Sequence, residues 1–100
     1  MTPFKPADAS TSFMPVSTTA ATNRTALKRS GNENTHVRLF NAGNTLVFLR
    51  FGDVTVSASA SDFPLPAGAV EVIDIGACSH MDAVTASGSS SVYATCGKGL

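Results

Sequence analysis

Residues 37–68 read VRLFNAGNTLVFLRFGDVTVSASASDFPLPAG and carry the strongest fold signal in the chain. Two apolar runs, Val37–Ala42 and Thr45–Phe51, flank Gly43-Asn44, a pair suited to the two-residue type II′ turn of a β-hairpin. That turn predicts two apolar faces: one holds Val37, Leu39, Leu46 and Phe48, and the other holds Phe40, Val47, Leu49 and Phe51. One face can be buried within the domain. The second requires a further layer of the chain or a partner molecule.

The rest of the chain also favours strands. We expect strands at Val54–Ala60 and Val70–Ile75, and a second hairpin formed by Met81–Ala86 and Ser91–Cys96. Between them, Asp62–Gly68 carries two prolines at alternate positions and predicts an extended path that ends in a turn. Turn signals recur about every 8 to 12 residues and no helical periodicity is visible, which is typical of an all-β sandwich or barrel.

The first residues differ in composition from the remainder. We expect an extended N-terminal arm or edge strand over residues 1–22, and a β-sandwich domain over residues 23–100. The prolines at positions 3, 6 and 15 oppose a helix. Phe4, Phe13 and Met14 are apolar positions by which such an arm could bind a neighbouring sheet edge. The alternative is that Phe13–Thr18 forms the first strand of the sandwich itself.

The composition argues against several classes of function. Seven basic and seven acidic residues give a formal net charge of zero. Nucleic acids and anionic membranes attract clustered positive charge, so neither is an expected partner. No apolar stretch approaches the ~20 residues of a membrane span. Residues 1–6 lack the pattern of a secretory signal, and we therefore expect synthesis in a cytoplasm.

The two cysteines are expected to be free thiols. In the second predicted hairpin, the best separation puts Met81, Ala83, Val92, Ala94 and Cys96 on an apolar face, and Asp82, Ser91, Tyr93 and Thr95 on a polar face. This register sends Cys78 to the side opposite Cys96, and a cytoplasmic protein seldom keeps a disulfide.

No catalytic or metal-binding constellation is visible in the sequence. Cys78, His80 and Cys96 lack a convincing fourth zinc ligand, and His36 lies far away in sequence. Asp53 and Asp62 occupy turn positions, where an aspartate bonds nearby backbone N–H groups. We therefore expect neither an enzyme nor a cofactor. Arg38 and Arg50 stand inside apolar strands, where a charge must snorkel to solvent, pair or face a partner, and Glu71 and Asp74 are available counter-charges.

Four segments carry a resemblance to a known class of proteins: Phe40–Gly43, Phe48–Asp53, Asp62–Gly68 with Glu71-Val72, and Val92–Thr95 before Gly97 and Gly99. Over about residues 36–99 the chain resembles small structural proteins of tailed bacteriophages, especially head decoration or cement proteins. The resemblance implies a small antiparallel, jelly-roll-like β-sandwich on the outside of the phage head. It would bind the major capsid protein and stabilise contacts between capsid subunits.

Other functions stay open. A head-tail connector, neck or tail component would use a similar small β domain, and a carbohydrate-binding module is a further alternative. The expected partners are the major capsid protein and the chain itself, as a homodimer or homotrimer. The expected interface residues are Phe4, Phe13, Met14, Arg38, Phe40, Phe48, Arg50 and Phe51.

The expected register yields a first test. A reducing agent should leave the thermal midpoint unchanged, because Cys78 and Cys96 are not predicted to meet. Thermal unfolding followed by circular dichroism, with and without the reductant, measures this directly. A fall of several degrees on reduction would mean that a disulfide forms and that the assigned faces are wrong.

Overall fold

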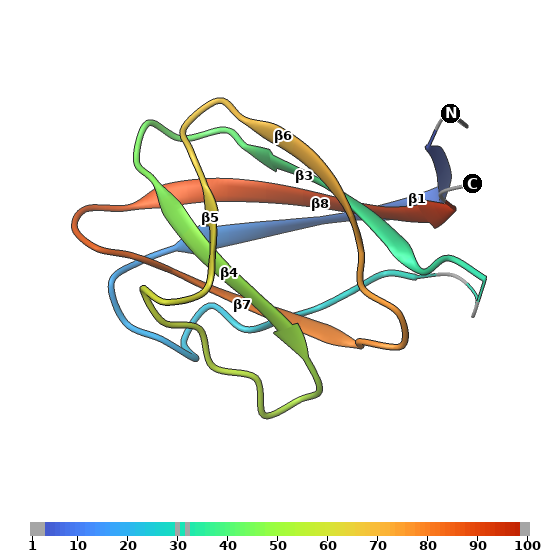
Figure 1. The fold of residues 1–100 in the computed structure, drawn as a ribbon, viewed down its shortest axis with the longest axis horizontal. Helices are drawn as coiled ribbons and strands as arrows, with labels where there is room; N and C mark the ends of the chain where they lie inside the picture. Colours follow the sequence, from blue (N-terminus) through green and yellow to red (C-terminus); the bar gives the residue numbers. More distant parts are fainter. Residues whose placement is uncertain (1–3, 30, 32, 99–100) are drawn as a thin grey trace.

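The computed structural model describes residues 4–29, 31 and 33–98, and within them the chain forms eight strands and no helix (Figure 1). The strands are β1 (Lys5–Val16), β2 (Thr25–Ala26), β3 (His36–Asn41), β4 (Val47–Gly52), β5 (Phe63–Leu65), β6 (Val70–Asp74), β7 (His80–Thr85) and β8 (Ser90–Lys98). Expectations for Met1, Thr2, Pro3, Ser30, Asn32 and Gly99 fall outside the described residues.

The strands form two antiparallel sheets of four. We call the first, in the order β1-β8-β3-β6, the β8 sheet, and the second, in the order β2-β7-β4-β5, the β7 sheet. The first strand pairs with the last, the second with the seventh, the third with the sixth and the fourth with the fifth. This is the order of a jelly roll, in which one long antiparallel hairpin is wrapped into two layers. The predicted all-β, jelly-roll-like sandwich is confirmed.

The core lies between the two layers, which Figure 1 shows crossing one over the other. Alternate residues of each strand point inward, so the period-2 pattern of the sequence fills the space between the sheets. The inward residues of the β8 sheet include Met14, Val16, Val37, Leu39, Val92, Ala94 and Cys96. Those of the β7 sheet include Val47, Leu49, Leu65, Met81 and Ala83.

The predicted hairpin of residues 37–51 is wrong, although both of its strands exist. β3 pairs with β6 and β8, whereas β4 pairs with β5 and β7. The intervening residues 42–46 carry the chain from one sheet to the other. As a result Val37 and Leu39 are buried together with Val47 and Leu49, which the hairpin had put on opposite faces.

The crossing is fixed by Asn41, the last residue of β3, whose side chain is fully buried. Its Nδ2 donates to the carbonyl oxygens of Thr45 at 2.8 Å and Leu65 at 2.9 Å. Its Oδ1 accepts from the Gly43 N–H at 3.2 Å and from the Ser90 hydroxyl at 2.6 Å. A Cβ at position 43 would collide with Ser90, so Gly43 is needed for space and does not form a hairpin turn.

The second predicted hairpin is wrong in the same way, because β7 and β8 lie in different sheets. Its side-chain alternation nevertheless holds. Every residue assigned to the apolar face is buried, and of the polar set only Asp82 is buried as well. Cys78 and Cys96 are free thiols, as expected. Burial raises the pKa of the Cys96 thiol.

One further expectation needs revision. Residues 54–60, predicted as a strand, form a loop that packs outside the β7 sheet. The N-terminal segment is the first strand of the sandwich, since β1 pairs with β8 along an edge of the β8 sheet. Residues 5–16 therefore form an edge strand, which is one of the two arrangements expected for this segment. Strand β6 lies where Val70–Ile75 was predicted, and Gly68 has the positive φ of 76° that a turn requires.

The Asn41 network predicts a specific loss of stability. Asn41→Ala leaves the Ser90 hydroxyl, the Gly43 N–H and two carbonyl groups without their partner. We expect the free energy of unfolding to fall by about 2 to 4 kcal/mol, measured by urea denaturation. The matched control is Asn44→Ala, because Asn44 is exposed; its effect should stay within about 0.5 kcal/mol. Equal effects of the two substitutions would contradict this role for Asn41.

Candidate functional site

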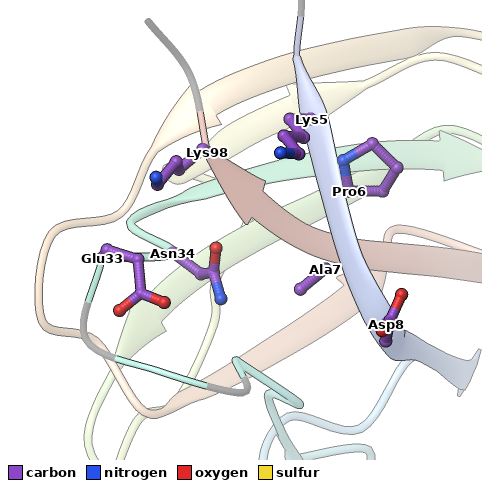
Figure 2. Close-up of a pocket in the computed structure, with 7 residues that line it drawn as sticks. All are labelled: Lys5, Pro6, Ala7, Asp8, Glu33, Asn34 and Lys98. Carbon is purple, nitrogen blue, oxygen red and sulfur yellow. The ribbon is translucent and has the colours of Figure 1, made fainter.

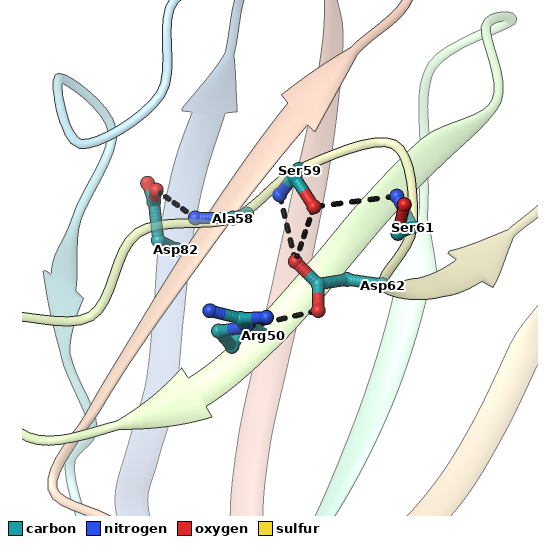
Figure 3. A network of polar contacts seen from close by, with 6 residues as sticks. All are labelled: Arg50, Ala58, Ser59, Ser61, Asp62 and Asp82. Atoms are coloured by element: carbon teal, nitrogen blue, oxygen red, sulfur yellow. Dashed lines mark hydrogen bonds and ion pairs between the residues drawn. The ribbon is translucent and has the colours of Figure 1, made fainter.

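The outer face of the β7 sheet is partly covered by two loops of the chain itself. Asp82 points outward from β7 and is fully buried beneath them. Its Oδ2 accepts the backbone N–H group of Ala58 at 2.8 Å (Figure 3) and that of Ala21, also at 2.8 Å. One carboxylate oxygen therefore holds both loops. Arg24 joins the loops as well, by donating from Nε to the Val56 carbonyl at 2.6 Å. The loops therefore cover the part of this face around Asp82 and Val84, while Phe48 is half-buried and Arg50 is exposed.

A second carboxylate shapes the loop between β4 and β5. Asp62 accepts from Arg50 Nε at 2.9 Å through Oδ1 and from the Ser59 N–H at 2.7 Å through Oδ2 (Figure 3). Burial raises the pKa of Asp62, but the Ser59 N–H and the Arg50 guanidinium outweigh it and leave the pKa lowered. The counter-charge of Arg50 is thus Asp62, not the predicted Glu71 or Asp74. Asp53 also bonds a turn, through Thr55.

The outer face of the β8 sheet is open and carries a row of apolar side chains. Phe13 of β1 lies opposite Tyr93 of β8, Tyr93 lies opposite Phe40 of β3, and Phe40 lies opposite Val70 of β6. Phe13, Tyr93 and Val70 are exposed by 50%, 41% and 42%, and Phe40 is half-buried. One row of cross-strand neighbours thus spans all four strands of the sheet.

The neighbouring row is more polar. Thr11 lies opposite Thr95, and their hydroxyl groups are 2.8 Å apart. Arg38 lies opposite both Thr95 and Val72, and Val72 is 45% exposed. We call the surface formed by these two rows the aromatic face; it comprises Thr11, Phe13, Arg38, Phe40, Val70, Val72, Tyr93 and Thr95.

The rings of the aromatic face are not stacked flat. The ring centroids of Phe13 and Tyr93 are 5.1 Å apart and the planes are inclined by 55°. This tilted contact is a favourable arrangement for two aromatic side chains, and it fixes both rings on the surface. Large apolar groups gathered on one exposed face of a small protein usually mark an interaction surface.

The structure brings together only part of the predicted interface. Phe13, Arg38 and Phe40 lie on the aromatic face, whereas Phe48 and Arg50 point outward from the opposite sheet. Met14 is fully buried and Phe51 packs against the core, so Met14 cannot contact a partner while the sandwich is folded. Phe4 lies over Gly97 at one end of the molecule.

The predicted interface lacks five members of the aromatic face: Thr11, Val70, Val72, Tyr93 and Thr95. Tyr93 was placed on a polar face and Val70 and Val72 on an ordinary strand, because the neighbours of β6 and β8 were unknown. The sequence signal that could identify these residues is the alternation of side chains along each strand. Tyr93 stands between buried Val92 and Ala94 and therefore points away from the core.

A cavity of about 340 Å³ lies at the end of the sandwich where β1 begins and β8 ends (Figure 2). Its charged lining residues are Lys5, Asp8, Glu33 and Lys98, two of each sign, so the cavity has no net charge to select an ion. The Asn34 amide on its wall already donates to the Arg29 carbonyl. We therefore regard the aromatic face as the stronger candidate site.

The described part of the chain shows no group of three or more His, Cys, Asp or Glu side chains arranged to hold a metal ion. His36 and His80 each share a hydrogen bond with the hydroxyl of the preceding residue, Thr35 or Ser79. Within residues 4–29, 31 and 33–98 there is also no helix long and apolar enough to span a membrane.

Comparisons with protein-family models, with curated proteins and with solved structures find no match to this chain. The functional argument therefore rests on the geometry of the two sheet faces.

The lowered pKa of Asp62 predicts an acid-sensitive loop. Because its folded pKa lies below the unfolded value, its ionised form stabilises the fold above about pH 4, and this contribution is lost as the pH falls further. Asp62→Asn should therefore destabilise the protein at pH 7 and have a smaller effect at pH 3, measured by urea unfolding. Glu71→Gln, on an exposed strand position, controls for the change in net charge. A loss independent of pH would contradict an ionic role for Asp62.

Proposed function

We propose that this protein is a structural protein that docks through its aromatic face onto a larger protein assembly, and that the assembly is the head of a tailed bacteriophage. In this proposal it decorates the outside of the head and stabilises contacts between major capsid subunits. The observation that carries the docking function is the contrast between the two sheets. The chain covers the central part of the β7 sheet, around Asp82, with its own loops and leaves an apolar row exposed across the β8 sheet.

The chemistry of the aromatic face supports a protein partner. Burying a large apolar side chain contributes about 1.5 to 3 kcal/mol, and the row offers four such residues in register. Aromatic residues and arginine are the types enriched in protein interfaces, and Arg38 stands beside the row, next to Val72. Its guanidinium can donate to a carboxylate or carbonyl of the partner.

The choice of a phage head rests on the resemblance of residues 36–99 and on the overall character of the chain. A small, neutral jelly roll suits attachment to a preformed lattice, where many weakly binding copies act together on one particle. A neck or tail ring could use the same face. The tilt between the Phe13 and Tyr93 rings is less suited to a flat sugar ring, which gives a carbohydrate-binding role less support.

The docking proposal predicts which substitution weakens attachment. On undecorated heads, prepared without this protein, Tyr93→Ala should reduce binding at least about tenfold, since the loss of one buried aromatic exceeds 1.4 kcal/mol. Leu46→Ala is the matched control, because Leu46 is also 41% exposed but lies on the crossing between the sheets. Circular dichroism should show that both variants remain folded.

Unchanged binding of the Tyr93 variant would contradict docking through this face.

The location of the protein in the virion is tested separately, by quantitative mass spectrometry of purified virions. A copy number that follows the major capsid protein supports decoration of the head, whereas the copy number of a single ring assigns the protein to the neck or tail.

A further inference from the structure

The open edges of the two sheets differ in how they are protected. An edge strand exposes unpaired N–H and C=O groups, and proteins usually block such edges with proline, a bulge, a charge or a very short strand. β1 contains Pro6 and Pro15, and its register shifts between Pro6 and Thr11. β2 has only two residues, and β5 has three with Pro64 in the middle. Three of the four edges are therefore blocked.

β6 has neither a proline nor a bulge and is not short, so its protection is limited to the charges of Glu71 and Asp74. It is the last strand of the β8 sheet and reads Val-Glu-Val-Ile-Asp over residues 70–74, with no proline, glycine or lysine and with three β-branched residues. Its register against β3 is regular along the whole strand. Four of its five side chains are exposed and Ile73 is half-buried, so neither face of this strand is fully covered.

The direction of its free backbone groups follows from the pairing with β3. Ile75 N–H donates to the Thr35 carbonyl at 2.8 Å, and Asn41 N–H donates to the Ala69 carbonyl at 3.1 Å. Hydrogen-bonded pairs alternate along an antiparallel ladder, so Glu71 and Ile73 also face β3. The N–H and C=O groups of Val70, Val72 and Asp74 consequently point to the open edge.

We propose that two copies of this chain pair through their β6 strands, antiparallel, with a two-fold axis at Val72. In this register Val72 lies opposite Val72 of the second copy, Glu71 opposite Ile73, and Val70 opposite Asp74. The outward backbone groups of Val70, Val72 and Asp74 all find partners, and no two acidic residues lie opposite each other. The strand is therefore complementary to itself, which identifies a second copy as the occupant.

The adjacent registers are less favourable. Moving the axis to Glu71 puts two carboxylates directly opposite each other, which is destabilising. Moving it to Ile73 places Val70 opposite Gly76, beyond the end of the strand. The axis at Val72 avoids both costs.

Pairing through β6 joins the two β8 sheets into one sheet of eight strands. The two aromatic faces then lie side by side on the same surface, because strands that pair in one sheet share its faces. The inference concerns the chain alone and does not depend on what the aromatic face binds. If the chain does not pair through β6, the proposed docking function is unaffected.

The first test is the association state of the purified full-length chain. Sedimentation equilibrium should show a monomer–dimer equilibrium. Val72→Lys should raise the dissociation constant at least about tenfold, because it puts two ammonium groups opposite each other. Val54→Lys is the matched control, since Val54 is 61% exposed on the loop after β4; its dissociation constant should not change.

The second test fixes the register by cross-linking. In a Cys78→Ser background, a single cysteine is introduced at position 72, 71 or 73 and the protein is oxidised. Cα atoms of residues directly opposite each other in a ladder are about 4.5 to 5.5 Å apart, within reach of a disulfide. Val72→Cys should give a covalent dimer, and Glu71→Cys and Ile73→Cys should not.

Three outcomes would overturn the inference. These are a strictly monomeric wild-type chain, a dimer that Val72→Lys leaves intact, and preferential cross-linking at position 71 or 73.

Discussion

The arrangement of the sandwich depends on one buried side chain, Asn41. Its amide group bonds two carbonyls, one N–H and one hydroxyl, and these belong to the β3–β4 crossing, to β5 and to β8. A buried amide is stable only when both of its ends are satisfied, so this geometry admits little variation. By directing the chain out of the β8 sheet after β3, Asn41 makes the two layers possible.

The second organising feature is the difference between the outer faces. On the β7 sheet, the buried carboxylate of Asp82 accepts a hydrogen bond from each of two loops. With these loops in place, Val56, Ala58 and Val84 are buried outside the sheet. The Oδ1 of Asp82 has no hydrogen-bond partner among the described residues, which leaves a cost that the packing of the loops must offset. Among the residues that the structure describes, no comparable loop crosses the aromatic face. The molecule thus has one outer face that its own loops partly cover and one outer face with an exposed apolar row.

The sequence predicted strand positions and buried residues better than it predicted pairing. Alternation identifies the inward side chains of β3, β4, β7 and β8 because the period of 2 is a local property. Which strand lies beside which depends on contacts between distant residues, and a short glycine-containing link such as 42–46 serves equally well for a hairpin or for a crossing between sheets. Hence Phe13 and Phe40 could be proposed as interface residues, but the row that unites them with Tyr93 and Val70 required the topology.

The pairing of first and last strands also governs how the chain can acquire its structure. β8 lies between β1 and β3, so the β8 sheet has a gap in its centre until residues 90–98 are available. Ser10 illustrates the separation, since its hydroxyl donates to the Cys96 carbonyl, 86 positions away. Contacts this distant in sequence close slowly, because the entropy of a long loop is lost before any contact compensates it. On the ribosome, the apolar faces of β1 and β3 therefore stay uncovered until residues 90–98 have emerged.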